Sequence, residues 1–245
     1  MHRFYLPDAP AGEGFECALS AEESQHAGRV LRLRAGDRVE CFDGRGCAWL
    51  CELAFSGQQA RVRALEPLPA NESGLRVTLY QGMPKLDKLD LIVQKATELG
   101  AHRIVPVNMA RSVARAEGKD AARKQERWQR IAMEAAKQCG RALVPEVAQP
   151  MSFAAALADM RERELMLMPY ELHRGRGLAA IAPGAGDVGL LIGPEGGIAP
   201  EEAERAQQVG ALPITLGPRI LRTETAAIAS LAMVMLRLGD AGGEA

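Results

Sequence analysis

The sequence of 245 residues lacks several segments by which common protein classes are recognised. Its longest nearly apolar run, Ala226 to Leu236, is too short to cross a lipid bilayer. No basic and then apolar signal stretch opens the chain, so we expect a cytoplasmic protein with no membrane partner. The five cysteines are an odd number without a CxxC pair, which favours reduced thiols over a disulfide framework.

Signature motifs of several enzyme classes are missing as well. The glycine-rich segment Gly193-Pro-Glu-Gly-Gly197 matches neither the dinucleotide fingerprint nor the phosphate-binding P-loop. Gly-x-Ser-x-Gly, which marks many hydrolases, does not occur. The four histidines and five cysteines show no zinc spacing, so we expect no metal.

Charge is close to balanced, with a formal net charge of −1, which argues against a uniformly basic nucleic-acid binder. The average hides a gradient along the chain. Residues 1–74 carry 8 Lys or Arg against 11 Asp or Glu, whereas residues 84–141 carry 13 against 7. The second span is either a set of solvated helix faces or a basic surface that contacts phosphates.

The first seventy residues read as short strands with one helix. Strands are expected over residues 3–6, 15–19, 37–42, 47–55 and 60–65, with an Asp-Gly turn at Asp43-Gly44. Ser20 and Glu23 fit a capping box for a helix that ends near Gly36. This pattern predicts a compact barrel or meander, suited to RNA or protein docking or serving only as structure.

The stretch Pro67 to Gly74 has the composition of a stiff linker, and it separates two expected domains, 1–70 and 75–245. After it, strands and helices alternate. Helices are expected over 85–99, with Leu86 on the buried face, over 120–139, capped by Asp120 and burying Cys139, and over 223–238. Ser152 starts another helix. Continuous apolar runs at 188–192 and 212–216 predict strands covered on both faces, and hence an α/β domain with a mostly parallel sheet.

Two of these runs end in glycine-bearing loops that open helices, at Gly193–Gly197 and at Gly217–Arg222. Ligands in open α/β sheets lie at the carboxyl ends of the strands, where glycine lets backbone amides come close. The loops contain mainly backbone and aliphatic groups, which suits a cofactor of the adenosine type.

Four motifs together resemble one family: Ile92 to Gly100, Glu134 to Arg141, Leu191 to Gly197 and Leu216 to Ala226. They are similar to those of ribosomal small subunit methyltransferase E, the 16S rRNA (uracil-N3)-methyltransferases of the SPOUT class. In the first domain, His26, the Val30-Leu-Arg32 segment and Phe42-Asp-Gly44 resemble that family's PUA-like RNA-binding module. Ala199 departs from the family, which often has a Ser or Thr cap there, although Pro200 keeps a helix-start signal.

The resemblance implies a PUA-like β-barrel followed by a SPOUT-type α/β domain with a deep trefoil knot. It also implies S-adenosylmethionine as cofactor and a homodimer acting on 16S rRNA within the 30S subunit. The residues expected to wrap the cofactor are Leu167, Met168, Ile192, Gly193, Pro194, Gly196, Gly197, Leu216, Gly217, Ile220, Leu221, Thr223 and Ala226. Leu167, Met168 and Ile192 are equally well explained as strand residues of the core.

Methyl transfer to uracil N3 requires loss of the imide proton and stabilisation of the resulting anion. Glu195 and Arg222 are the first candidates for these two roles, followed by Arg141, with Gln138 and Glu134 beside it. Alternatively, Glu195 is a charge that complements a helix dipole, Arg222 binds loop carbonyls, and water accepts the proton. Glu224 is more simply a first-turn helix charge.

The candidate RNA contacts are His26, Arg29, Arg32, Arg111 and Arg115, of which the arginines would bind phosphates. Two other functions remain open beside base methylation. One is a SPOUT ribose 2′-O-methyltransferase, and the other is a non-catalytic RNA-binding protein of ribosome assembly.

Overall fold

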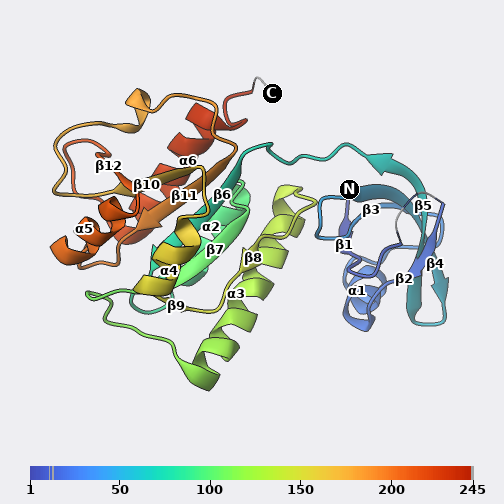
Figure 1. The fold of residues 1–245 in the computed structure, drawn as a ribbon. Coiled ribbons are helices and arrows are strands. Elements are labelled where there is room, and N and C mark those ends of the chain that lie inside the picture. Colours follow the sequence, from blue (N-terminus) through green and yellow to red (C-terminus); the bar gives the residue numbers. More distant parts are fainter. Residues whose placement is uncertain (11, 13, 244–245) are drawn as a thin grey trace. The chain divides into compact units, whose positions relative to one another are not determined.

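The computed structural model describes residues 1–10, 12 and 14–243 (Figure 1). The chain forms two compact units. The first comprises Met1–Glu72 and Ala136–Val144, and the second comprises Ser73–Ala135 together with the chain from Pro145 onward. The assignment of residues 136–144 to the first unit could not be read from the linker composition.

The first unit contains a curled half-barrel sheet with the strand order β1-β3-β4-β5-β2. Its strands are β1 (Arg3–Tyr5), β2 (Glu16–Ala18), β3 (Arg38–Phe42), β4 (Ala48–Ser56) and β5 (Gln59–Leu68). Only the β1–β3 pair of this sheet is parallel, and the other pairs are antiparallel. The PUA-like fold expected from the sequence is therefore confirmed, as a half-barrel that one short parallel strand extends.

The helical segment of this unit differs from its prediction. Ser20 caps α1 (Ala21–Gln25), because its hydroxyl accepts the amide of Glu23 at 3.1 Å. The Glu23 carboxylate does not return to the cap; it accepts the Tyr5 amide and binds Lys137 Nζ at 2.7 Å. A π-helical turn, His26–Val30, follows α1, so the helix ends well before Gly36. Arg32 then has a φ of 55°, which ends the helical geometry.

Residues 136–144 are bound to the first unit by ion pairs. Arg141 is buried and its guanidinium contacts Glu72 at 2.8 Å, while the other oxygen of Glu72 accepts the Leu143 amide. Arg3 donates to the carbonyls of Ala136 and Arg141. Glu72 lies in the expected linker, so that segment is fastened to the first unit rather than solvated throughout.

The second unit is built on a sheet in which every strand pair is parallel. The strand order is β12-β10-β11-β6-β7-β8, with β9 also pairing with β7. The strands are β6 (Arg76–Gly82), β7 (Arg103–Asn108), β8 (Glu146–Val147), β9 (Met151–Ser152), β10 (Leu165–Pro169), β11 (Asp187–Ile192) and β12 (Leu212–Ile214). The parallel α/β prediction is confirmed. The prediction that 212–216 is covered on both faces was wrong, because β12 is an edge strand with only Ile214 fully buried.

The helices of this unit are α2 (Lys88–Glu98), α3 (Gly118–Cys139), α4 (Phe153–Met160), α5 (Pro200–Gln208) and α6 (Thr223–Leu238). Helices α4 and α6 have their predicted starts, and the Ser152 hydroxyl caps α4 by accepting the Ala155 amide. Helix α2 begins three residues later than expected. Leu86, predicted to be buried, is 91% exposed and has a φ of 54°. No helix in the described part of the chain is both long and apolar enough to span a membrane.

Helix α3, in contrast to α2, begins before its predicted start. Its first turn contains Asp120, which binds Lys124 at 2.9 Å and so lies inside the helix instead of capping it. Trp128 is buried and donates its indole N–H to Asp90 of α2. Cys139, placed on the buried stripe by its periodicity, is exposed.

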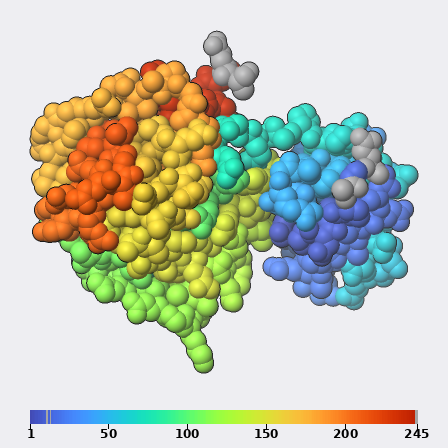
Figure 2. Space-filling model, viewed as in Figure 1, coloured from blue at the N-terminus to red at the C-terminus, as the bar shows by residue number. Residues whose placement is uncertain are grey.

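Helices cover both faces of the parallel sheet (Figure 1). On one face, α4 and α5 bury an apolar cluster that includes Tyr80, Val105, Leu157 and Ala206. Figure 2 shows α5 in orange beside the yellow surface around α4. Between these two helices, the Arg205 guanidinium lies over the Phe153 ring. On the other face, α6 packs against β6, β11 and α2. The strand ends between these layers carry the candidate site.

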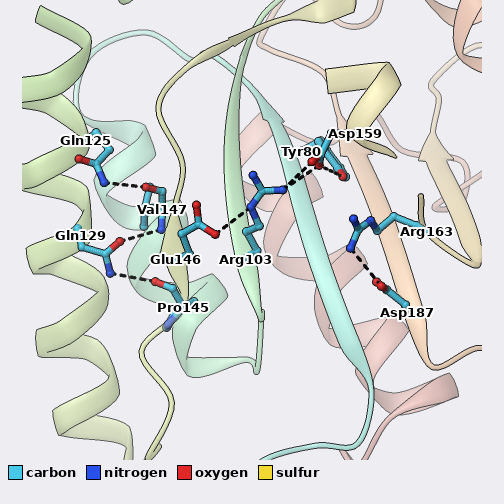
Figure 3. A network of polar contacts seen from close by, with 10 residues as sticks. All are labelled: Tyr80, Arg103, Gln125, Gln129, Pro145, Glu146, Val147, Asp159, Arg163 and Asp187. Atoms are coloured by element: carbon cyan, nitrogen blue, oxygen red, sulfur yellow. Dashed lines mark hydrogen bonds and ion pairs between the residues drawn. The ribbon is translucent and has the colours of Figure 1, made fainter. Parts of the chain in front are cut away.

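A polar network fastens the strands to the surrounding helices (Figure 3). Asp159 of α4 accepts the Tyr80 hydroxyl from β6 and the Arg103 guanidinium from β7. Arg103 also pairs with Glu146 of β8. Burial first, and then the hydrogen bond to Asp159, raise the pKa of Tyr80 far above its usual range. The network therefore fixes β6 at Tyr80, directly before the last two residues of the strand, Gln81 and Gly82.

Candidate active site

Three loops meet the same edge of the sheet, because β10, β11 and β12 are parallel neighbours. The first glycine loop follows β11 at 193–199, and the second follows β12 at 215–222. A third loop, beginning at Tyr170, follows β10 between them. The carboxyl ends of parallel strands are where ligands bind in such sheets. The expected crevice therefore has three walls rather than two.

The Thr223 hydroxyl joins the two glycine loops. It donates to the carbonyl of Gly193 at 2.7 Å and accepts the side-chain amide of Gln81 at 2.9 Å. Thr223 is the first residue of α6 and is 4% exposed, and Gln81 of β6 is fully buried. Because these partners are buried, each depends on the others for hydrogen bonding. The two glycine-bearing bends thus lie in direct contact.

Lys88, at the start of α2, links the same two loops by charge. Its ammonium lies 3.1 Å from Glu195 of the first loop and 3.2 Å from Glu224 at the start of α6. Glu195 also accepts the Lys85 amide, at 3.0 Å. The sequence analysis did not anticipate this link, because both partners of Lys88 are more than a hundred positions away in the chain.

These contacts keep both carboxylates ionised. Burial alone would raise the pKa of Glu195, but hydrogen bonds from its own amide, the Lys85 amide and Lys88 hold the pKa below its usual range. Glu224 behaves in the same way, with its own amide and Lys88 lowering a pKa that burial would raise. The hydrogen bonds to Glu195 and then Glu224 raise the pKa of Lys88. The cluster therefore carries two carboxylates and one ammonium at neutral pH.

Glycine is required at two positions of this site by close approach. A Cβ added to Gly82, the last residue of β6, would lie 2.6 Å from Pro194 Cδ, so this glycine lets the first loop pass over the strand end. Gly197 has a φ of +72°, and a Cβ there would meet the Glu171 carboxylate at 2.0 Å. The first loop is consequently pressed against both β6 and the third loop.

Glu171 is a site residue that sequence reasoning missed. It lies two residues after the end of β10, is exposed, and its carboxylate lies close to Gly197, while no described residue donates a hydrogen bond to that carboxylate. Gln81 was missed as well. The available signal was positional, since Gln81 and Glu171 both lie at or just beyond the ends of strands that border the glycine loops.

The predicted cofactor residues line this edge with different exposure. Leu167, Met168, Ile192, Pro194 and Thr223 are buried, Gly193, Gly197, Leu216, Leu221 and Ala226 are half-buried, and Gly196, Gly217 and Ile220 are exposed. Leu167 and Met168 belong to β10 and pack in the sheet, which agrees with their reading as core residues.

The predicted catalytic residues belong to both units. Arg222 is exposed at the N-cap of α6, and its guanidinium forms no hydrogen bond or ion pair with any residue that the structure describes. The expected bond from Arg222 to loop carbonyls is therefore absent from the described chain. Glu195 forms its ion pair with Lys88 in the second unit. Arg141 belongs to the first unit and binds Glu72 there.

The predicted RNA contacts occupy both units. In the second, Arg111 donates to the Gly196 carbonyl at 2.9 Å, so it supports the first glycine loop, and Arg115 is exposed nearby in the chain. In the first, His26 contacts the Phe4 ring edge-on with centroids 6.5 Å apart. Arg29 donates to the Gln58 side chain at 3.1 Å, and Arg32 is exposed.

Comparisons with known proteins agree with this architecture. Residues 71–235 match a family model described as an RNA methyltransferase domain, and residues 19–63 match one described as an RNA methyltransferase PUA domain. The ribosomal RNA small subunit methyltransferase E of Bacillus subtilis is 36% identical, covering 89% of this chain and 88% of the relative. That of Mycobacterium bovis is 32% identical, covering 94% and 90%.

Solved structures are similar over nearly the whole chain. The Neisseria gonorrhoeae ribosomal RNA small subunit methyltransferase E bound to S-adenosyl methionine has a TM-score of 0.89 at 34% identity, covering 98% of this chain and 99% of that one. A Legionella pneumophila methyltransferase in complex with the same cofactor has a TM-score of 0.87 at 32% identity, covering 97% and 98%. The chain belongs to the ribosomal RNA small subunit methyltransferase E family, RNA methyltransferases of the SPOUT class.

Proposed function

We propose that this protein transfers the methyl group of S-adenosylmethionine to N3 of a uridine in 16S rRNA. The observation that carries the proposal is the Thr223 hydroxyl, which holds the two glycine loops together at the carboxyl ends of the sheet. Residues 1–70 serve as the RNA-binding domain and residues 75–245 as the catalytic domain, in which the chain follows the trefoil-knot path implied by the resemblance. A cytoplasmic location follows from this substrate.

The strand ends fit a nucleoside cofactor. The absence of side chains at Gly82 and Gly197 lets the first loop pack closely against β6 and the third loop. The first loop (Ile192, Gly193, Pro194, Gly196 and Gly197), the second (Leu216, Gly217, Ile220, Leu221, Thr223 and Ala226) and the strand residues Leu167 and Met168 would hold the cofactor. When bound, S-adenosylmethionine supplies a methyl group activated by an adjacent sulfonium.

Arg222 is the residue we assign to the substrate anion. Its guanidinium is exposed beside the second loop and forms no ion pair with the described residues, so its charge is available to a uracil that has lost its N3 proton. Glu195 fits the role of proton acceptor less well, since three groups already donate to it and its pKa is lowered. We therefore assign the proton to water and Glu195 to holding Lys88.

Arg141 remains a third catalytic candidate, with its charge balanced by Glu72. Substrate contacts come from His26, Arg29 and Arg32 in the first unit and from Arg111 and Arg115 in the second. The arginines would bind phosphates and position the RNA without reading its sequence. The substrate is 16S rRNA as presented by the 30S subunit.

A homodimer is supported by apolar side chains left exposed on the second unit. Leu236 of α6 is 65% exposed, Met233 is 37% exposed, and Leu91 of α2 is 42% exposed, while α2 and α6 pack against each other. A second copy that covers these residues would remove apolar surface from water. Sedimentation of the wild type and of Leu236→Arg tests this: the proposal expects a dimer that the substitution dissociates.

The deciding experiment methylates 16S rRNA from a strain that lacks the modification, given as naked RNA and as 30S particles. Digestion and mass spectrometry then locate the methyl group. A methyl on N3 of uridine in the 30S reaction is the expected result. A methyl on a ribose 2′-oxygen would favour the second enzyme reading, and no heat of binding with S-adenosylmethionine in calorimetry would favour a non-catalytic RNA binder.

A further inference from the structure

A cavity of about 650 Å³ lies in the first unit, within the segment that matches the PUA domain, and none of the residues assigned to methyl transfer line it. Its lining comes from residues 21–29, which form α1 and the π-helical turn, and from residues 55–59, at the β4–β5 hairpin. Its volume is within the range of small-molecule sites, roughly 300–1,000 Å³. π-helical turns are rare and occur often at functional sites.

Hydrogen bonds join the two segments that line the cavity. The side-chain amide of Gln59 donates to the Leu19 carbonyl at 2.7 Å and to the Ser24 hydroxyl at 3.1 Å. The Ser24 hydroxyl in turn accepts the Ala60 amide at 3.1 Å. These bonds fasten α1 to the β4–β5 hairpin, so the two segments that line the cavity are fixed relative to each other.

The walls combine one aromatic ring with groups that bind polar ligands. The Phe55 ring is half-buried and faces Gly28, where an added Cβ would lie 3.4 Å from Phe55 Cε1. Arg29 is oriented by its hydrogen bond to Gln58, which uses one of its five N–H groups. Seven of the ten lining residues, Gln25 and Ser56 among them, are exposed, so the cavity is open to solvent.

The charge of the lining favours an anionic or neutral polar ligand. No carboxylate is among the lining residues, and Arg29 is the one charged group there. Arg32 and Arg34, a short distance further along the chain, are exposed, and their guanidinium groups form no ion pair with any described residue. An aromatic ring, amide and hydroxyl groups, and the Arg29 cation are the features that bind an unstacked base and its phosphate.

We infer that this cavity receives a single unstacked nucleotide of the RNA substrate, with the base against Phe55 and Gln58 and the phosphate at Arg29. The inference rests on the proposed function for its choice of RNA. The cavity would be a second contact with the RNA chain, separate from the uridine that is methylated. RNA affinity should therefore depend on a nucleotide occupying the cavity as well as on surface charge.

The test uses the full-length protein and short single-stranded oligoribonucleotides that carry one 4-thiouridine, crosslinked by light and mapped by mass spectrometry. The crosslink is expected within residues 25–29 or 55–59. Gly28→Leu fills the cavity without removing charge, so it should weaken binding roughly tenfold with an unchanged salt slope, whereas Arg29→Ala should also reduce the slope by about one. Arg61→Ala, an exposed cation of β5 outside the cavity, is the matched control and should keep the crosslink.

A crosslink elsewhere, or binding by a folded Gly28→Leu within about twofold of the wild type, would overturn the inference. If Gly28→Leu melts early, the crosslink position in the unaltered chain still decides. Methyl transfer is measured separately. A protein that crosslinks in the cavity but does not methylate RNA would refute the proposed function alone, and one that methylates without this crosslink would refute the cavity alone.

Discussion

Removing the Thr223 hydroxyl should both destabilise the second unit and weaken cofactor binding. Thr223→Val keeps the shape of the side chain but leaves the Gly193 carbonyl without its donor, while the Gln81 amide retains its bond to the Gly82 carbonyl at 2.9 Å. One N–H of the fully buried Gln81 amide and the half-buried Gly193 carbonyl are thus left without a partner, and one unsatisfied buried group costs about 1–3 kcal/mol of the free energy of unfolding. Because the lost bond joins the two glycine loops, we expect S-adenosylmethionine to bind on the order of tenfold more weakly, equivalent to about 1.4 kcal/mol.

Urea unfolding measures the first effect and titration calorimetry the second. Thr225→Val is the matched control, since Thr225 is exposed in the same helix and its change should leave the free energy of unfolding within about 0.5 kcal/mol of the wild type. The reasoning would be refuted by a Thr223→Val protein that is destabilised yet binds the cofactor as the wild type does. That result would mean that the contact between the loops does not shape the cofactor site.

Four further substitutions test separate parts of the account. Arg222→Ala should lower kcat by about 10²–10³-fold with RNA affinity nearly unchanged, and full turnover would remove its catalytic role. Arg32→Ala should weaken RNA binding and reduce its salt slope by about one, which a salt titration checks. Glu195→Gln should lower kcat less than the roughly 10²–10⁴-fold expected for loss of a general base, so a larger loss would restore Glu195 as proton acceptor. Asp159→Asn should lower the free energy of unfolding by about 1–3 kcal/mol at neutral pH, measured by urea unfolding. Burial would raise the pKa of Asp159, but its bonds to Tyr80 and Arg103 lower it, so the stabilisation is lost as the pH falls through that lowered pKa and the two proteins should converge in acid.

Local signals in the sequence were sufficient for much of the fold. Ser152 predicts the start of α4, because its hydroxyl accepts an amide three positions away. The apolar run after Arg222 predicts both ends of α6. Leu86 was misplaced because periodicity assumes helical φ values, and its φ of 54° puts it before the helix begins. Glu23 was assigned to its own helix cap because Lys137, 114 positions away, is invisible to local patterns.

At the candidate site, too, local patterns could be predicted and contacts between distant residues could not. The glycine loops could be found from composition, because a strand end followed by glycine and a helix start is a local pattern. The residue that joins them could not be found in this way, because Lys88 comes close to Glu195 and Glu224 only when the sheet has folded. Thr223 was predicted as a cofactor contact, and the structure adds a structural reason for a hydroxyl at that position.

The distribution of charge at the two loops constrains which residue can serve the substrate. Lys88 lies between two carboxylates, and withdrawing it to bind a uracil anion would leave Glu195 and Glu224 unpaired beside each other. Unpaired like charges are unfavourable, so the ammonium is more stable where it is. Arg222 forms no hydrogen bond or ion pair with a described residue, although its charge also favours the ionised form of Glu224, and a guanidinium offers several parallel donors to a planar base. The loops are therefore held together by one cation, and the other remains available for the anion that methyl transfer requires.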